Sequence, residues 1–147
     1  MEYTHLTEVS GASATPEQLE RISHRYQLTA HYAEGKRLLE VGCGPGLGLG
    51  YLLTAASSVV GGDYTADLLR QGRAHYEGRV PLVRLDAHRL PFAPGSFDVV
   101  GLLEAIYYLE DPARFVADAR RVLDPGGLLI ICTVNKDWDG FSPSPQS

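Results

Sequence analysis

The sequence has few cysteines, no basic cluster and no long apolar run. Two cysteines among 147 residues predict neither a disulfide framework nor a thiolate metal site, and no pair of histidines has metal-ligand spacing. We therefore expect no metal. Lysines and arginines gather on no stretch and the formal net charge is -5, so we expect no nucleic-acid partner and no membrane partner. No window approaches the roughly 20 apolar residues of a membrane-spanning helix. We therefore expect a cytoplasmic protein.

Length and composition predict a single domain. Hydrophobic residues make up 44% of the chain and charged residues 21%, a balance typical of a globular protein. We expect an N-terminal arm and helix over residues 1–35, a core over residues 36–135 and a tail or truncated loop over residues 136–147. The helix is expected to begin after Thr15, because Thr15 and Gln18 have the spacing of a capping box.

Five apolar runs alternate with helical patterns along the chain. The expected strands comprise residues 37–41, 58–63, 80–85, 97–103 and 128–134. A helix is expected over residues 47–56, between the first two strands. This alternation predicts an α/β fold with a doubly wound parallel sheet and helices on both faces. The last run is almost unbroken, as in strands that are buried on both faces. In such a sheet, ligands bind at the carboxyl ends of the strands.

The first expected strand ends in a turn with a glycine at every other position of residues 42–48. Glycine costs roughly 0.5–1 kcal/mol in a regular element, so this pattern indicates a tight turn or a close approach to a ligand. The spacing fits neither the G-x-G-x-x-G motif nor a Walker loop. Asp63 and Asp86 end the next two strands, and an acid about 20 residues beyond the turn can accept both hydroxyls of a ribose. The pattern favours a ligand without a pyrophosphate.

Five short motifs follow one another along the chain. They are EVGCGPG at 40–46, Gly62-Asp63, DAHRLPF at 86–92, SFDVV at 96–100 and RVLDPGG at 121–127. Together they resemble the motifs of class I S-adenosylmethionine-dependent methyltransferases, in particular small-molecule enzymes of type 11. The resemblance implies a Rossmann-like sheet of strand order 3-2-1-4-5, with S-adenosylmethionine as cofactor and S-adenosylhomocysteine as product.

The resemblance also implies roles around the glycine turn. Glu40 would orient the methionine end through its amine or a bridging water, although it could instead cap backbone amides. The backbone from Gly42 through Cys43 to Gly44 would approach the methionine and the ribose. Asp63 would bind the ribose diol, because an ionised carboxylate only accepts hydrogen bonds.

Residues after the second, third and fourth strands complete the implied site. Tyr64 would lie near the adenine, Asp86 would accept from its amino group, and the Ala87 N–H would reach a ring nitrogen. Asp86 also suits a simple strand end, where aspartate is common. The backbone at Leu102 and Leu103 would face the methionine ammonium.

The sequence singles out no catalytic base. Transfer from a sulfonium is an in-line displacement to which the protein contributes mainly proximity, so a base is optional. The candidates, should the acceptor need deprotonation, are Glu104, Tyr107, Tyr108 and His88. The two tyrosines stand where many small-molecule members carry His-His, so they either meet the acceptor or pack in the fold.

The first expected helix carries four rings with two possible roles. They are His24, Tyr26, His31 and Tyr32. These rings either close over the cofactor or serve only as packed and solvated side chains, and the spacing does not decide between the two.

Three functions remain open. The leading interpretation is an enzyme that transfers a methyl group to a small-molecule acceptor. The alternative is a non-catalytic or truncated S-adenosylmethionine-binding module, because family members usually continue after the fifth strand with a helix and an antiparallel strand pair, and this chain stops first. A nicotinamide-dependent oxidoreductase is disfavoured by the failed G-x-G-x-x-G spacing.

The fifth expected strand generates a first prediction. Without the strand pair, residues 128–134 form an uncovered apolar edge, which invites pairing with another chain. We expect a homodimer or a swapped assembly through this strand. Light scattering at high protein concentration checks this, and a monomer would count against it.

Overall fold

The computed structural model describes residues 15–133 and Asp137. The expected N-terminal arm, residues 1–14, lies outside this range. So do most of the expected tail and Val134, the last residue of the fifth expected strand.

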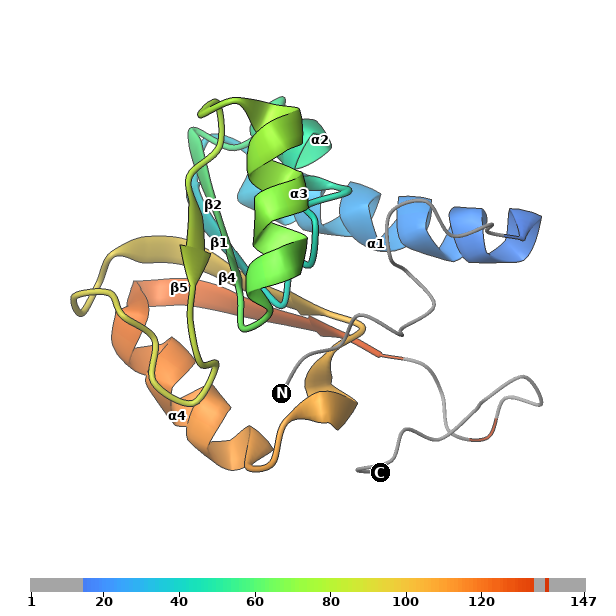
Figure 1. Cartoon of the computed structure of the whole chain (residues 1–147). Helices are drawn as coiled ribbons and strands as arrows, with labels where there is room; N and C mark the ends of the chain where they lie inside the picture. The colour runs from blue at the N-terminus through green and yellow to red at the C-terminus, as the bar shows by residue number, and fades with distance from the viewer. Residues whose placement is uncertain (1–14, 134–136, 138–147) are drawn as a thin grey trace.

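Five parallel strands form one sheet in the order β3-β2-β1-β4-β5 (Figure 1). The strands are β1 Arg37–Val41, β2 Ser58–Asp63, β3 Leu82–Arg84, β4 Phe97–Leu103 and β5 Leu123–Cys132. The predicted strand order and the predicted parallel sheet are both confirmed. The strand order reverses beside β1, so its carboxyl end lies at the switch point where ligands bind in such folds.

Helices cover both faces of this sheet, as predicted. They are α1 Pro16–Ala33, α2 Leu49–Leu53, α3 Ala66–Tyr76 and α4 Pro112–Val122, with a short 3₁₀ turn, η1, at Ile106–Tyr108. Alternate residues of β1 point to opposite faces. Leu38 therefore packs with the buried residues of α1, α2 and α3, whereas Leu39 and Val41 pack with Phe115 of α4.

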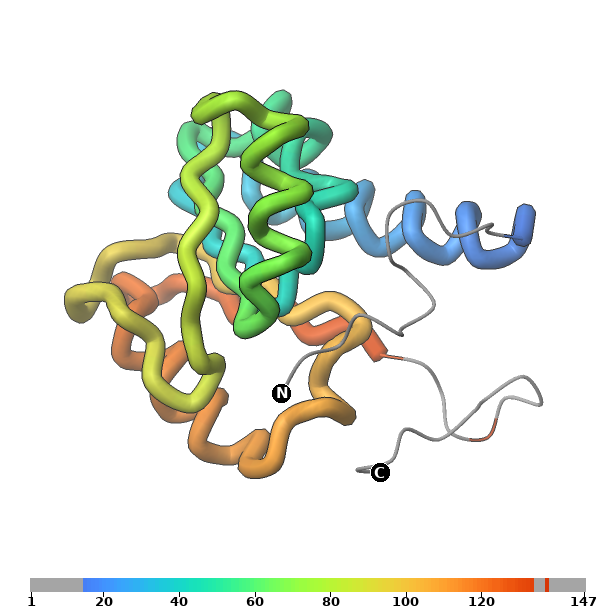
Figure 2. Tube along the Cα trace, viewed as in Figure 1, coloured from blue at the N-terminus to red at the C-terminus, as the bar shows by residue number. Residues whose placement is uncertain are grey.

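Helix α1 begins with the predicted capping box. The Thr15 hydroxyl accepts from the Gln18 N–H at 3.1 Å, and the Gln18 side chain accepts from the Thr15 N–H at 2.8 Å. Only the C-terminal half of the helix contacts the sheet, as the trace in Figure 2 shows. The buried residues of α1 accordingly run from Arg25 to Ala33.

Two elements are shorter than the sequence predicts. Strand β3 covers Leu82–Arg84 instead of residues 80–85, because Pro81 has no N–H to donate to the sheet. Helix α2 begins at Leu49, two residues later than expected, because the glycine turn extends to Gly48.

The expected burial of the fifth strand on both faces is wrong. Strand β5 begins at Leu123, and its pairing with β4 shifts register between Phe97 and Val99. Leu128 is 38% exposed and Ile131 is 37% exposed. The reason is that β5 lies at the end of the sheet, and among the described residues no strand pairs with its outer side.

No helix in residues 15–133 combines the length and the apolar character that a membrane crossing requires.

Gly48 shows why α1 and the glycine turn fit together. Its backbone has φ -101° and ψ -4°, angles that any residue can adopt. A Cβ added at Gly48 would lie 2.1 Å from Cε1 of Tyr26, inside the ring of a buried side chain of α1. Packing therefore requires this glycine.

A second prediction compares two glycines of this region. We expect Gly48→Ala to lower the free energy of unfolding by about 1–3 kcal/mol through overpacking. Gly50→Ala places its Cβ 3.4 Å from the nearest Tyr76 atom, so it is tolerated and gains up to about 1 kcal/mol of helix propensity. Denaturant unfolding measures both variants, and equal stabilities would contradict this account.

Candidate functional site

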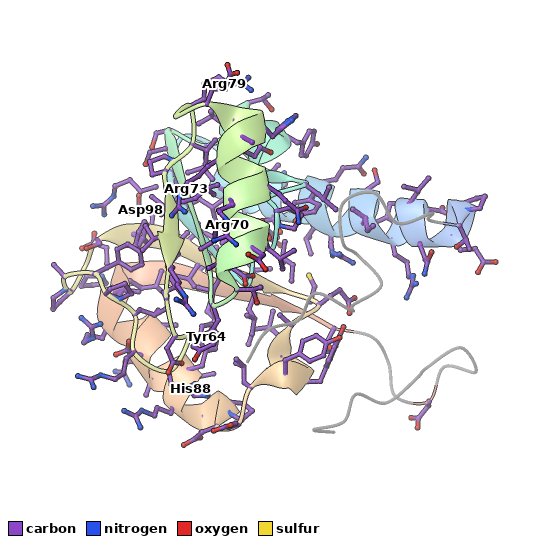
Figure 3. The ribbon with its side chains drawn as sticks, in the orientation of Figure 1. Tyr64, Arg70, Arg73, Arg79, His88 and Asp98 are labelled. Carbon is purple, nitrogen blue, oxygen red and sulfur yellow. The ribbon has the colours of Figure 1, made fainter. Side chains whose placement is uncertain are left out.

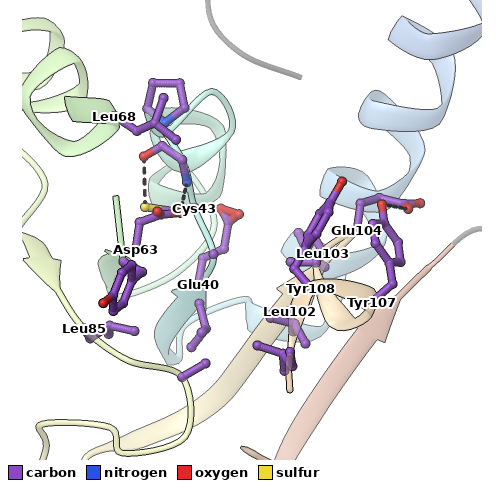
Figure 4. A pocket seen from close by; sticks show the side chains of 18 of the residues that line it. Glu40, Cys43, Asp63, Leu68, Leu85, Leu102, Leu103, Glu104, Tyr107 and Tyr108 are labelled. Carbon is purple, nitrogen blue, oxygen red and sulfur yellow. Dashed lines mark hydrogen bonds between the residues drawn. The ribbon is translucent and has the colours of Figure 1, made fainter. Parts of the chain in front are cut away.

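A cavity of about 370 Å³ opens at the carboxyl ends of β1, β2 and β4 (Figure 4). Every residue that the sequence assigned to the cofactor, and every candidate base, lines this one cavity. These residues are Glu40, Gly42, Cys43, Gly44, Asp63, Tyr64, Asp86, Ala87, His88, Leu102, Leu103, Glu104, Tyr107 and Tyr108. Side chains from the loops after four strands thus meet at one edge of the sheet.

The glycine turn forms the floor of the cavity. The N–H groups of Gly42 and Cys43 donate to the carbonyl of Gly62 at 2.8 and 3.0 Å, which ties the turn to β2. Gly42 and Gly44 have φ of +74° and +57°, in the region that favours glycine. A Cβ added at Gly44 would meet nothing nearer than 4.0 Å, so the turn leaves open space beside its backbone.

Tyr76 of α3 holds the far side of the same turn. Its hydroxyl donates to the Gly46 carbonyl and accepts from the Gly50 N–H at 3.0 Å. One buried phenol thus bridges the turn and the first residues of α2. The turn is therefore fixed from both β2 and α3.

Asp63, at the end of β2, is held by two backbone donors. Its Oδ2 accepts from the Gly44 N–H at 2.8 Å and its Oδ1 from the Thr65 N–H at 2.9 Å. The residue is only 7% exposed. Each carboxylate oxygen has a second lone pair, so Asp63 can accept from two further donors, one per oxygen, without leaving the turn.

Glu40, at the C-terminal half of β1, is a buried carboxylate reached from α1. The residue is 2% exposed, and the Tyr26 hydroxyl lies 3.0 and 3.2 Å from its two oxygens. Burial, and then the Glu40 carboxylate, raise the pKa of Tyr26 well above its usual value. Burial, followed by Glu40 and Asp63, likewise raises the pKa of Cys43, so both side chains stay protonated and neutral.

Tyr26 is the only ring of α1, among the four considered from the sequence, that lines the cavity. Tyr32 is 46% exposed and the His24 side chain 67% exposed; His31 is exposed as well. These three rings therefore do not close over the cavity.

A cluster from α1 and the segment after β4 lines the other end of the cavity. Glu104 has φ +58°, an uncommon conformation for a residue with a side chain, and its N–H donates to the Cys132 carbonyl at 2.7 Å. The Tyr107 hydroxyl donates to Glu104 Oε2 at 3.2 Å (Figure 4). Arg25 Nη1 lies 3.9 Å from Oε1, so a buried guanidinium offsets this carboxylate.

The sequence reasoning missed several lining residues, among them Arg25, which is charged and buried. They are Ile22, Arg25, Val41, Pro45, Leu47, Leu68, Leu85, Ala105, Leu109 and Glu110. One signal could have found Arg25, because Ile22, Arg25 and Tyr26 have the spacing of one helical face. A charge on that face indicates a polar space opposite it.

Tyr64 and His88 lie at the cavity end of the molecule, whereas Arg79 lies at the opposite end (Figure 3). The Arg84 guanidinium lies 5.4 Å from the centre of the Tyr64 ring and donates to the Tyr64 carbonyl. The ring of Tyr64, 43% exposed, is therefore held at the rim by a cation–π contact.

His88 bridges two segments beside the cavity. Its Nδ1 lies 2.7 Å from Asp86 Oδ1, and its Nε2 accepts from the N–H of Asp111, the N-cap of α4, at 3.1 Å. Because an accepting Nε2 carries no proton, the neutral ring has its proton on Nδ1 and donates it to Asp86. Both ring nitrogens are engaged, which makes His88 a poor proton acceptor for a substrate.

In residues 15–133, no three His, Cys, Asp or Glu side chains gather as a metal centre would require.

A model of the family described as "Methyltransferase domain" matches residues 39–131. A protein of Mycolicibacterium smegmatis named as a probable S-adenosylmethionine-dependent methyltransferase is 38% identical over 118 residues, which cover 80% of this chain and 45% of that protein. Phthiotriol/phenolphthiotriol dimycocerosates methyltransferase 1 of Mycobacterium ulcerans is 42% identical over 113 residues, with coverages of 71% and 41%.

A solved S-adenosylmethionine-dependent methyltransferase from Mesorhizobium loti superposes with a TM-score of 0.68. It is 27% identical, and the match covers 77% of this chain and 52% of that structure. The chain belongs to the methyltransferase domain family and is a class I S-adenosylmethionine-dependent methyltransferase domain, as its motifs predicted. S-adenosylmethionine is the cofactor of this family. The chain spans less than half the length of the two curated relatives named above.

The contact between His88 and Asp86 generates a third prediction. Hydrogen bonds from the His88 backbone N–H first, and from its ring second, lower the pKa of Asp86. In His88→Phe only the backbone donor remains, so the pKa of Asp86 should rise toward its ordinary value. A carboxyl ¹³C NMR titration measures it. Asp98, whose pKa of about 2 is lowered by Arg37, is the internal control and should not change. An unaltered Asp86 pKa would show that the ring does not donate.

Proposed function

We propose that this chain transfers a methyl group from S-adenosylmethionine to a small-molecule acceptor by in-line displacement. The observation that carries the proposal is the Asp63 carboxylate fixed against Gly44 at the floor of the cavity. A buried acid held by backbone donors, with a lone pair to spare on each oxygen, is matched to a vicinal diol.

The remaining lining residues fit the same cofactor. Glu40, Asp63 and Asp86 are carboxylates that only accept hydrogen bonds when ionised, and all three line the cavity. S-adenosylmethionine presents donors of the matching kind: an ammonium group, two ribose hydroxyls and an adenine amino group. Apolar side chains such as Leu85 and Leu102 line the same cavity and suit the flat faces of a purine.

The proposed assignment follows the order of the strands. Glu40 and the backbone of Leu102 and Leu103 take the methionine end. Asp63 takes the ribose and the Gly42–Gly44 backbone approaches both groups, with Cys43 as a neutral neighbour. A separate set takes the adenine: Tyr64, Asp86 and the Ala87 N–H.

The chain contributes to the reaction mainly by holding two reactants in line. When bound, S-adenosylmethionine supplies a methyl group already activated for transfer. Proximity and orientation account for up to about 7–11 kcal/mol of a barrier. Of the candidate bases, Glu104 offers a carboxylate in the cavity, 12% exposed, with Arg25 at 3.9 Å. Tyr107 and Tyr108 line the same end, so we place the acceptor there, with Glu104 able to receive its proton.

A second candidate function is a binding module without turnover. It is favoured by the length of the chain, which spans 45% of the M. smegmatis relative, so other parts of a longer protein could complete the acceptor site. A homodimer through the exposed side of β5 would supply such a part from a second copy.

We propose a cytoplasmic location, on the composition of the sequence alone.

A fourth prediction tests the cofactor assignment. We expect Asp63→Ala to weaken the affinity for S-adenosylmethionine at least about tenfold, because hydrogen bonds to a charged group are lost. The matched control is Asp67→Ala, since Asp67 is an acid four residues away that does not line the cavity. The affinity of Asp67→Ala for S-adenosylmethionine should equal that of the wild type.

Isothermal titration calorimetry measures each affinity, with S-adenosylhomocysteine and NAD as further ligands. Equal affinities in the wild type and Asp63→Ala would overturn the ribose assignment. Tight NAD binding would overturn the cofactor. Binding of S-adenosylmethionine without methyl transfer to any acceptor tried would favour the binding module.

A further inference from the structure

Helix α1 brings one hydroxyl group to a buried carboxylate of the cavity. Tyr26 and Glu40 are 8% and 2% exposed. The phenol oxygen lies 3.0 Å from Oε2 and 3.2 Å from Oε1, so a single donor contacts both oxygens. Both residues line the cavity. The contact links an element outside the sheet to the strand that precedes the glycine turn.

The position of the Tyr26 ring is fixed by the turn itself. The ring fills the space that a side chain at residue 48 would need, because a Cβ there would lie 2.1 to 2.4 Å from three of its atoms. The hydroxyl group is thereby carried to Glu40 by a ring that packs directly on the turn. Tyr26, Glu40 and Gly48 form one unit at the edge of the cavity.

We propose that Tyr26 is a positioning residue of the cofactor site, whose hydroxyl holds the Glu40 carboxylate in the orientation that receives the cationic amine of the methionine end. This inference rests on the proposed function. It makes α1 part of the cofactor site. From the sequence alone, Tyr26 could either close over the cofactor or serve only as a packed side chain.

Burial and hydrogen bonding act in opposite directions on Glu40. Removal from water disfavours the ionised carboxylate, whereas a donated hydrogen bond favours it. The charged and titratable groups around this pair are Arg25 and Tyr26 on α1, Cys43 in the turn, Asp63 after β2 and Glu104 after β4. Tyr26 and Cys43 remain neutral near pH 7, because their pKa values are raised. Tyr26 is then a permanent donor to Glu40.

The experiment is a double-mutant cycle of Tyr26→Phe and Glu40→Gln. Phenylalanine keeps the ring that packs on Gly48 and removes only the hydroxyl. The binding of S-adenosylhomocysteine, which carries the same amine, is measured by calorimetry at about pH 8. This readout needs neither an acceptor nor turnover.

We expect Tyr26→Phe to weaken binding about tenfold at pH 8. In the Glu40→Gln background the same substitution should change affinity less than about twofold, because Tyr26 acts through Glu40. Losses that simply add would overturn the proposal.

Tyr76→Phe is the matched control, since it removes another buried phenol hydroxyl that contacts the turn through Gly46 and Gly50. It should lower the unfolding midpoint, and its effect on binding should add to that of Glu40→Gln. Losses in Tyr76→Phe and Glu40→Gln that do not add would overturn the proposal, as would wild-type affinity of Tyr26→Phe. If the wild type binds neither S-adenosylmethionine nor S-adenosylhomocysteine, the proposed function itself fails.

Discussion

The two hydrogen bonds that the Asp63 carboxylate accepts are the interaction on which the site depends. One comes from Gly44 in the turn after β1, and the other from Thr65 at the start of α3. A buried ionised carboxylate is costly unless donors surround it. Asp63 therefore organises the two loops as much as they position Asp63. These two hydrogen bonds join the loop after β1 to the loop after β2 at the edge of the sheet.

The fold makes this arrangement possible because neighbouring parallel strands end at the same edge. Strands β1 and β2 pair in register from Arg37 with Ser58 to Val41 with Gly62, so the residues that follow them are neighbours in space. Each helix contacts a different part of this arrangement. Helix α3 fixes the turn through Tyr76, helix α1 brings Tyr26 to Glu40, and helix α4 closes the opposite face.

The sequence was sufficient for the features that follow from periodicity and turn chemistry. Alternating strands and helices gave the sheet, and the glycine turn, Asp63 and Asp86 could be placed at one edge because parallel strands share their carboxyl ends. Arg25 was missed although its spacing places it on the same helical face as Ile22 and Tyr26, because a charged residue is ordinarily expected to be exposed. The exposure of β5 was not predicted either. An apolar run has the same sequence pattern whether or not another strand covers it, and Leu128 is exposed only because β5 lies at the end of the sheet.

The missing side chain at Gly48 ties α1 to the glycine turn in a way that limits how such a protein can be recombined. The ring of Tyr26 occupies the volume that any larger residue at position 48 would fill. A hybrid protein that takes its first helix from one parent and its turn from another keeps this contact only if it has both the tyrosine at position 26 and the glycine at position 48. A viable exchange boundary therefore lies before residue 15 or beyond residue 48, and the helix and the turn are inherited together.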